Sequence, residues 1–235
     1  MISPNIEEHL INSLADGTGN SYFTYAGRPG IYYIPGYVTV DECNYIVHLC
    51  ESNMMSAHHT STLEVDSPSF NCYTWRYSFY QDEILKNICN RLARLVNCPL
   101  DYAEYLEIRR FDNMGFYNNM CDYINEDDIQ LQVGSTLEFP MGAWEVLEPN
   151  HKQMSPSGNA IGAVNVTLYE HPNVRFKYKN VSAPPMVPES GMAIINSVAT
   201  DNVKWDITTN LDNMPFWMIK LRFREFSRTV ETGDA

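Results

Sequence analysis

The residues of this chain that could do chemistry are concentrated in a run near its middle, 109–122. An extended, apolar-rich segment leads into a turn at Gly115, an aromatic residue follows, and the run ends in the carboxylate of Asp122. In an enzyme built from strands, a loop of this kind is a common place for a pair of metal ligands. Of such a pair at the end of this run, only the carboxylate of Asp122 is present. The run therefore predicts a metal site that has lost one ligand of its pair.

Three aspartates offer a second way to bind a metal ion. Asp122, Asp201 and Asp206 could come together at one end of a sheet and form an oxygen-rich site for Mg²⁺ or Ca²⁺. Neighbouring acidic side chains on a protein surface are usually solvated and bind no metal. We therefore favour solvated carboxylates over a metal site at these aspartates. His58 and His59 lie in a Ser/Thr-rich stretch, and adjacent side chains point apart on any regular element. A solvated loop pair is therefore favoured over a metal site at these histidines.

Two cations near the end of the chain could bind an anion. Lys220 and Arg222 lie on the same face of a predicted strand as Met218, because side chains two residues apart share a face. Anion binding is an open possibility there, and a salt bridge at the edge of a sheet is the favoured interpretation. The sequence contains no phosphate-binding loop, dinucleotide-binding, hydrolase or zinc-spaced cysteine motif.

The composition limits the classes of partner. The chain has 235 residues, with 44% hydrophobic and 19% charged side chains, which is ordinary for a globular protein. Its formal net charge of −13 would repel a nucleic-acid backbone or an anionic membrane. We expect protein partners or a homo-oligomer, with no nucleic acid and no membrane. No apolar run approaches the ~18–20 residues of a membrane span, and residues 1–8 do not resemble a signal peptide, so a non-secreted, cytoplasmic protein is expected.

Two amphipathic helices are predicted in the first half of the chain. Thr39 and Glu42 form a capping box ahead of the first, and the second ends before Pro99. Six cysteines are scattered without C-x-x-C spacing, and at least three lie on helical apolar faces, which favours buried, reduced thiols over disulfides. The apolar stripes are Cys43, Ile46, Val47 and Cys50 in the first helix and Ile84, Leu85, Ile88, Leu92, Leu95 and Val96 in the second.

The other regular elements are predicted as strands. Two early helices and later strands predict an α+β chain built on a sheet sandwich or jelly roll. We divide it into an N-terminal arm (1–29), one domain (30–226) with a long insertion loop (124–157), and a polar tail (227–235). The predicted strands lie at 31–34, 76–80, 105–111, 163–169, 174–178, 192–196 and 216–223.

Four segments, taken in order, carry a resemblance to a known family. Residues 34–43 are similar to the family's "I-x-x-F-L-S-x-E-E-C" lead-in to its first helix, and residues 76–78 to its "R-T-S" strand. Residues 88–95 are similar to its "I-x-x-R-I/L-A-x-L" helix, and residues 188–195 to its "P-x-x-G-x-A-L-x-F" strand. Over about residues 31–223 the chain resembles the 2-oxoglutarate/Fe(II) dioxygenases of the prolyl 4-hydroxylase type. The resemblance implies a double-stranded β-helix (jelly roll) with N-terminal supporting helices.

The same resemblance implies where iron would bind. The family uses His-x-Asp/Glu and a distant histidine, which leave positions for 2-oxoglutarate and oxygen. Laid on this sequence, the pattern places Met120 at the first histidine, Asp122 at the acid and Trp205 at the distal histidine. Pro215 falls where a basic residue would hold the 2-oxoglutarate carboxylate. These four positions are therefore expected to be vestiges of a metal and cosubstrate site, with no metal bound.

The expected loss of the metal site does not depend on the alignment. None of the six histidines is followed two positions later by Asp or Glu, and no histidine lies beyond His171. An indole has no lone pair for a metal, and a thioether is a soft ligand poorly matched to Fe(II) beside a carboxylate. The turn His171-Pro172-Asn173 also stands where the family has a Gly-Gly-Glu-Thr segment. The sequence therefore argues against iron-dependent hydroxylation.

Three functions remain open. The first is a non-catalytic module of the dioxygenase fold, used without a cofactor for binding or assembly, with a phage virion structural protein as its most concrete form. The second is an active hydroxylase that uses Fe(II) and 2-oxoglutarate through non-standard ligands. The third is a carbohydrate- or peptide-binding module that uses the Tyr-rich surface and the loop 124–157.

Overall fold

The structure, a computed structural model, describes the residues that build the body of the domain. The described residues do not include most of the predicted insertion loop, the polar tail, Asp122 or Asp201. For residues 116–121 and 204–208, only the backbone is described. The described residues are 9–10, 22–24, 31–61, 70–80, 82–112, 116–121, 157–178, 184–197, 204–208 and 214–226.

The described strands pair antiparallel along one continuous path. The order is β1-β2-β9-β7-β11-β5-β4-β6-β10-β8, and β3 pairs with β4 beside this path. Their bounds are β1 Phe23–Thr24, β2 Ile31–Ile34, β3 His58–Ser61, β4 Phe70–Tyr77, β5 Leu106–Phe111, β6 Phe116–Cys121, β7 Ser157–Tyr169, β8 Arg175–Tyr178, β9 Ala193–Ser197, β10 Lys204–Thr208 and β11 Phe216–Phe226.

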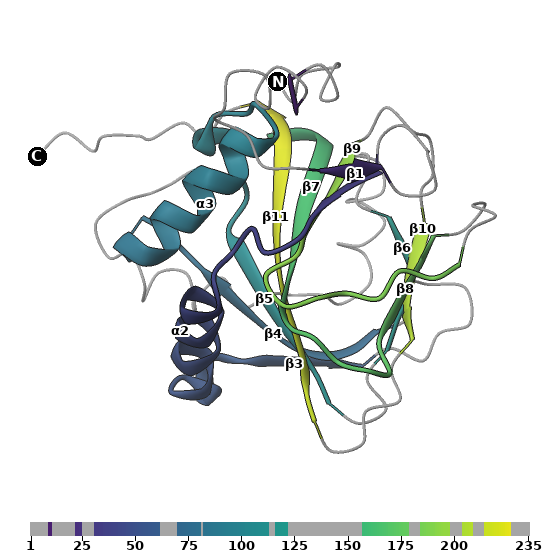
Figure 1. Ribbon diagram of the computed structural model, residues 1–235. Helices are drawn as coiled ribbons and strands as arrows, with labels where there is room; N and C mark the ends of the chain where they lie inside the picture. The colour runs from purple at the N-terminus through teal and green to yellow at the C-terminus, as the bar shows by residue number, and fades with distance from the viewer. Residues whose placement is uncertain are drawn as a thin grey trace, which may run out of the picture.

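The strand path folds into two layers. β4 joins them, because its first residues pair with β6 while Tyr73–Tyr77 pair with β5. Figure 1 shows β7, β11 and β5 in a central sheet, with β6, β10 and β8 in a second layer on one side and the helices α2 (Val40–Glu51) and α3 (Glu83–Leu95) on the other. The α+β jelly roll with two supporting helices is thus confirmed. Among the described residues, no helix is long and apolar enough to cross a membrane.

The capping box of the first helix forms as the sequence predicts. The Thr39 hydroxyl accepts the Glu42 backbone N–H (3.3 Å), and the Glu42 carboxylate accepts the Thr39 N–H (2.9 Å). These bonds satisfy two backbone donors at the helix start that have no partner within the helix. α2 therefore begins at Val40, immediately after its cap.

Replacing this cap should have a measurable cost. Thr39→Ala is expected to lower the free energy of unfolding by about 1 kcal/mol, because the side-chain acceptor for the Glu42 N–H is lost. Urea unfolding followed by circular dichroism measures it. Asp41→Ala, an exposed change in the same helical turn, is the control. Equal losses in the two variants would contradict a specific role for the box.

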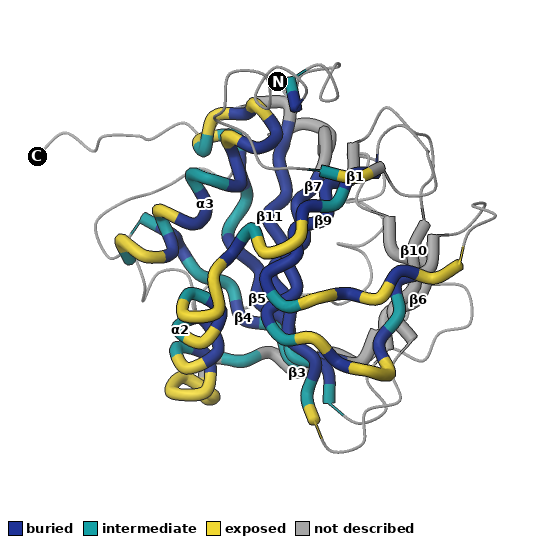
Figure 2. Tube along the Cα trace, viewed as in Figure 1, coloured by how far each residue is buried: buried dark blue, intermediate teal, exposed yellow. Residues whose placement is uncertain are grey.

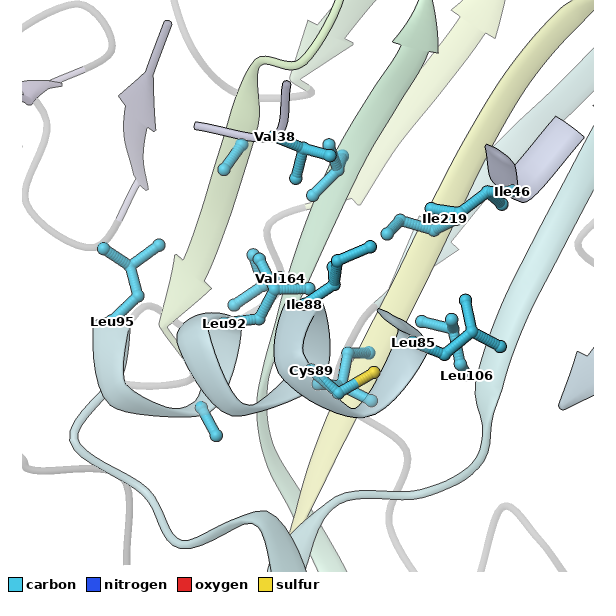
Figure 3. Packing of buried hydrophobic residues seen from close by; sticks show 14 of the residues in the cluster. Val38, Ile46, Leu85, Ile88, Cys89, Leu92, Leu95, Leu106, Val164 and Ile219 are labelled. Atoms are coloured by element: carbon cyan, nitrogen blue, oxygen red, sulfur yellow. The ribbon is translucent and has the colours of Figure 1, made fainter. Parts of the chain in front are cut away.

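Two apolar cores lie on opposite faces of the central sheet. The larger one lies between the sheet and the two helices, and Figure 3 shows Ile88 and Leu92 of α3 directed at the sheet that carries Val164 and Ile219. The smaller one lies between the two layers of strands and includes Phe111, Phe176 and Phe216. Because side chains alternate along a strand, β5 and β11 contribute to both cores, whereas β7 contributes Val164, Val166 and Leu168 to the larger one. Figure 2 shows that β5 and β11 are buried over most of their length, as is β7 over residues 163–168.

The core positions predicted from the two helical stripes are confirmed with one exception. The two helical stripes are buried except for Ile84, which lies in the first turn of α3 and is 41% exposed. The five described cysteines are buried and free of disulfides, as predicted. Burial raises the pKa of the Cys50 thiol to about 12, so this thiol stays protonated at neutral pH.

Two local predictions were wrong. His58 and His59 do not lie in a loop: they begin β3, opposite Thr74 and Tyr73 of β4. Pairing with a neighbouring strand, rather than local sequence preference, decides their conformation. The strand predicted at 76–80 instead ends at Tyr77, because it is the last part of the longer β4.

Candidate functional site

The strand pair β6 and β10 brings together two of the positions that the resemblance assigned to metal ligands. Met120 and Trp205 are register partners in this antiparallel pair. Positions opposite each other in such a pair are close neighbours in space. β10 also pairs with β8, so Trp205 lies between two neighbouring strands of the second layer. Asp122 follows β6 directly in the sequence and lies outside the described residues.

The fourth predicted position, Pro215, lies immediately before β11 and is half-buried. The next two side chains on the inner face, Phe216 and Met218, belong to the core between the layers. The Phe216 ring centroid lies 5.9 Å from that of Phe111 and 6.0 Å from that of Phe176. At this end of β11, the described part of the barrel interior is therefore filled by apolar side chains.

Lys220 and Arg222 do not form an edge salt bridge. β11 lies between β7 and β5 in the middle of the sheet, and Lys220 is only 1% exposed. Both side chains alternate with Ile219, Leu221 and Phe223, which face the helices, so they lie on the inner face of the barrel. The edge interpretation was wrong because strand order along the sheet cannot be read from the sequence of one strand.

These cations belong to a larger group of charged side chains, all buried except the half-buried Arg76 and Glu104. We call it the inner-face cluster: Arg76, Glu104, Glu107, Arg109, Lys220, Arg222 and Arg224. Glu107 accepts hydrogen bonds from Arg76 (2.9 Å) and from Arg109. Glu104 pairs with Arg222 (3.1 Å) and with Arg224. Lys220 is the register partner of Glu107. The cluster thus spans three neighbouring strands, β4, β5 and β11, and includes Glu104, which lies two residues before β5.

The electrostatics of Glu107 show how strongly these cations act. Burial would raise the pKa of its carboxyl group, because it penalises the charged form. The positive charges of Arg109, Arg76, Arg222 and Lys220 outweigh that penalty and hold the pKa well below its ordinary value. Glu107 is therefore ionised at neutral pH although it is 6% exposed.

Two buried polar residues of β7 continue this surface. Asn165 is the register partner of Lys220, and Thr167 is the register partner of Met218. Thr167 is 1% exposed, and its Oγ1 has no hydrogen-bond partner within the described part of the chain. The sequence did not indicate that Arg76, Glu107, Arg109 and Thr167 lie together on the inner face of the barrel. The signal was present as polar residues alternating with apolar ones in both β5 and β11, a pattern that normally indicates a solvent-facing side.

The described residues do not fit the iron centre of the family. Among them, no group of three His, Cys, Asp or Glu side chains is arranged to hold a metal ion. The register-paired positions carry Met and Trp, whose side chains are poor Fe(II) ligands. Of the aspartates considered for Mg²⁺ or Ca²⁺, Asp206 lies in β10 and the other two lie outside the described residues, so that site stays a prediction.

His171 has a structural place in this arrangement. It is 3% exposed in the turn between β7 and β8, and its Nδ1 accepts the backbone N–H of Asn173 (3.1 Å). The turn predicted at His171-Pro172-Asn173 is present, but it is not a hairpin turn, because β7 pairs with β9 and β11 whereas β8 pairs with β10. The imidazole stabilises the turn by accepting the backbone N–H of Asn173.

Comparison with known structures agrees with this architecture. A viral collagen prolyl hydroxylase from Paramecium Bursaria Chlorella virus-1, in its 2OG complex, superposes with a TM-score of 0.56 at 11% identity, covering 84% of this chain and 97% of the other. A Pseudomonas putida prolyl-4-hydroxylase gives 0.54 at 9% identity, covering 95% and 98%. A Trichoplax adhaerens prolyl hydroxylase, in complex with a hypoxia inducible factor peptide fragment, gives 0.52 at 8% identity, covering 94% and 89%.

At such low identity these matches establish the fold. No protein-family model matches the chain, and no curated protein matches it either. The chain has the double-stranded β-helix fold of the 2-oxoglutarate/Fe(II) oxygenases, with prolyl 4-hydroxylase-like structures matching over most of its length.

Proposed function

We propose that this oxygenase-fold chain is a non-catalytic module used for binding or assembly. The observation that carries the proposal is the register pairing of Met120 with Trp205. The resemblance assigns both positions to iron ligands, and the strand pairing makes them neighbours, as two ligands of one metal would have to be. Their residue types supply a soft thioether and an indole without a lone pair, so Fe(II) is poorly held between them.

The start of β11 supports the same proposal. Where the resemblance calls for a basic partner of the 2-oxoglutarate carboxylate, the chain has Pro215, followed on the inner face by Phe216. A carboxylate placed against apolar side chains would lose its hydration without gaining a charged partner. Cosubstrate binding in the manner of the family is therefore disfavoured together with iron binding.

Anaerobic titration with Fe(II) and 2-oxoglutarate tests the proposal. We expect no metal-to-ligand charge-transfer absorption band and no stoichiometric Fe(II) binding. The reason is that neither Met120 nor Trp205 offers a nitrogen or oxygen lone pair that could coordinate the metal. The double variant Met120→His/Trp205→His is the matched control: Fe(II) binding gained by this variant alone would support the assignment of both positions. A charge-transfer band in the unmodified protein would overturn the proposal in favour of a hydroxylase with non-standard ligands.

Assembly with protein partners is one form of this proposal. A place in a virion is its most specific version and stays a prediction. Light scattering coupled to size-exclusion chromatography measures self-association directly. A strictly monomeric protein would restrict the proposal to binding of other molecules.

A further inference from the structure

Arg110 lies on the outer face of the central sheet, the face that carries the helices. It shares this face with the core residue Ile108, because side chains two residues apart point the same way along a strand. Its register partners on either side are Tyr73 and Trp217, and its Cζ lies 5.7 Å from the ring centroid of each. Its Nε donates to the carboxylate of Asp112 (2.7 Å). The guanidinium is therefore held in place by two rings and a carboxylate while the side chain stays 25% exposed.

The thioether of Met54 is a further neighbour of this guanidinium. Met54 begins the short 3-10 helix η2 (Met54–Ser56), which lies between α2 and β3. Arg110 Nη1 donates to Met54 Sδ (3.9 Å). The indole N–H of Trp75 donates to the carbonyl of Asn53 (3.2 Å), which holds the start of η2 against the sheet. A thioether sulfur is a weak acceptor, so the contact between Met54 and Arg110 contributes little to stability in this form.

The methionines differ in their access to a dissolved oxidant. Among those whose side chains the structure describes, three are exposed and three are buried. The exposed ones are Met54 (40%), Met55 (101%) and Met214 (59%), and the buried ones are Met186, Met192 and Met218. Of the exposed three, Met54 is the one whose sulfur accepts a hydrogen bond from a cation within the described part of the chain.

A peroxide converts an accessible thioether into a sulfoxide. A lone pair of the sulfur attacks one peroxide oxygen, so that an S–O bond forms and the O–O bond breaks. The departing hydroxide takes the proton of the transferred hydroxyl and leaves as water. The sulfur loses two electrons, and the peroxide gains them. The product carries a polar oxygen one bond away from the sulfur.

The position of Arg110 gives this product a partner. Because Met54 Sδ lies 3.9 Å from Arg110 Nη1, an oxygen on the side of the sulfur that faces the guanidinium can reach the usual N–H···O distance of about 2.7–3.2 Å. Neither side chain has to move far for this bond to form. Hydrogen bonds to a charged donor are also stronger than those between neutral groups.

We propose that Met54 is a reversible oxidation site, at which a peroxide forms a sulfoxide that bonds to Arg110 and fastens η2 to β5. Methionine oxidation usually disrupts structure, because a polar sulfoxide is placed among apolar side chains. At Met54 the expected effect is the opposite, since the new oxygen meets a cation that is already held in place. A binding module and an enzyme could both carry such a site, so it is independent of the proposed function.

Limited oxidation with hydrogen peroxide, in protein treated with EDTA so that no iron takes part, tests this site. Peptide mass spectrometry identifies the oxidised methionines. Met55→Leu keeps the sulfur of Met54, and Met54→Leu removes it, so the two variants are matched within one helical turn. We expect oxidation to change the melting temperature of Met55→Leu more favourably than that of Met54→Leu, by about 2–4 °C, the shift that one ordinary hydrogen bond gives in a chain of this length. Reduction by methionine sulfoxide reductases of both epimer specificities should reverse the difference.

Two further variants tie the effect to Arg110. Arg110→Gln removes the cation and should abolish the favourable shift on oxidation. Met54→Gln places an amide oxygen near the position of the sulfoxide oxygen without any oxidant, and it should melt at a higher temperature than Met54→Leu. The same two replacements at Met55 are the control, and we expect them to melt at the same temperature as each other.

Three results would overturn the proposed site. The first is an unmodified Met54 in protein whose Met55 and Met214 have been oxidised. The second is an equal shift on oxidation in Met54→Leu and Met55→Leu, or a less favourable one in Met55→Leu. The third is a Met54→Gln protein that melts no higher than Met54→Leu.

Discussion

Glu107→Gln is expected to lower the free energy of unfolding at neutral pH by about 3–5 kcal/mol, the usual cost of removing one partner from a buried ion pair. The reason is that Arg76 and Arg109 both bond to this carboxylate. Glutamine keeps the size of the side chain and removes its charge, so the buried Arg109 and the half-buried Arg76 lose their counter-charge. Urea unfolding monitored by tryptophan fluorescence measures the loss.

The same variant has a defined pH dependence. The folded-state pKa of Glu107 is held well below its ordinary value of 4.5. Its contribution to stability is therefore fully present above that ordinary value and is lost as the pH falls through the folded-state pKa. The difference in stability between the unmodified protein and Glu107→Gln should be constant from about pH 5 to 8 and shrink in more acidic solution.

A matched control separates this effect from the chemistry of the substitution. Glu83→Gln makes the same change in an exposed carboxylate on α3, which lies 3.6 Å from Lys86. Exposed pairs of this kind contribute about 0–1 kcal/mol. A Glu107→Gln protein as stable as Glu83→Gln at neutral pH would show that the inner-face cluster does not need its central carboxylate.

Gly191→Ala is expected to cost at least about 2 kcal/mol, because two separate penalties add. Gly191 has a φ of +73°, and a Cβ at this position would lie 2.1 Å from the carbonyl oxygen of Val38. The backbone cannot move away cheaply: Val38 N–H donates to the Gly191 carbonyl (3.1 Å), and Gly191 N–H donates to the Thr167 carbonyl (2.8 Å). Any shift would weaken both hydrogen bonds.

Gly36→Ala is the natural comparison for this prediction. Gly36 has a similar φ of +62°, but a Cβ there would have no heavy atom within 4 Å. Only the left-handed backbone is then penalised, by roughly 1–2 kcal/mol. Chemical unfolding of both variants isolates the steric contribution at Gly191, and equal losses would contradict it.

The sequence predicted the elements whose signals are local. Thr39 and Glu42 determine a helix start through hydrogen bonds three residues apart, and the apolar stripes of both helices follow from helical periodicity. The strand at 31–34 also agrees with the structure. In each case the deciding interactions or pattern lie within a few residues, so the sequence alone contains them.

The sequence could not predict features that depend on strand order. β10 has only a short run, Lys204–Thr208, and it becomes a strand because β6 and β8 pair with it on both sides. The alternating cations of β11 look solvent-facing until the sheet places β5 and β7 beside them and the second layer covers their face. The charged interior of the candidate site is therefore a property of the assembled barrel.

The position of β11 in the sheet has a consequence for the way in which this chain folds. Residues 216–226 lie in the centre of the sheet, between β5 and β7, and pair with residues as distant along the chain as 107–111. Until β11 inserts, the facing edges of β5 and β7 have no partner, and the helix-side core lacks Trp217, Ile219, Leu221 and Phe223. Such non-local pairing makes folding slow. During synthesis on the ribosome, cooperative closure of the barrel must wait until this strand has emerged.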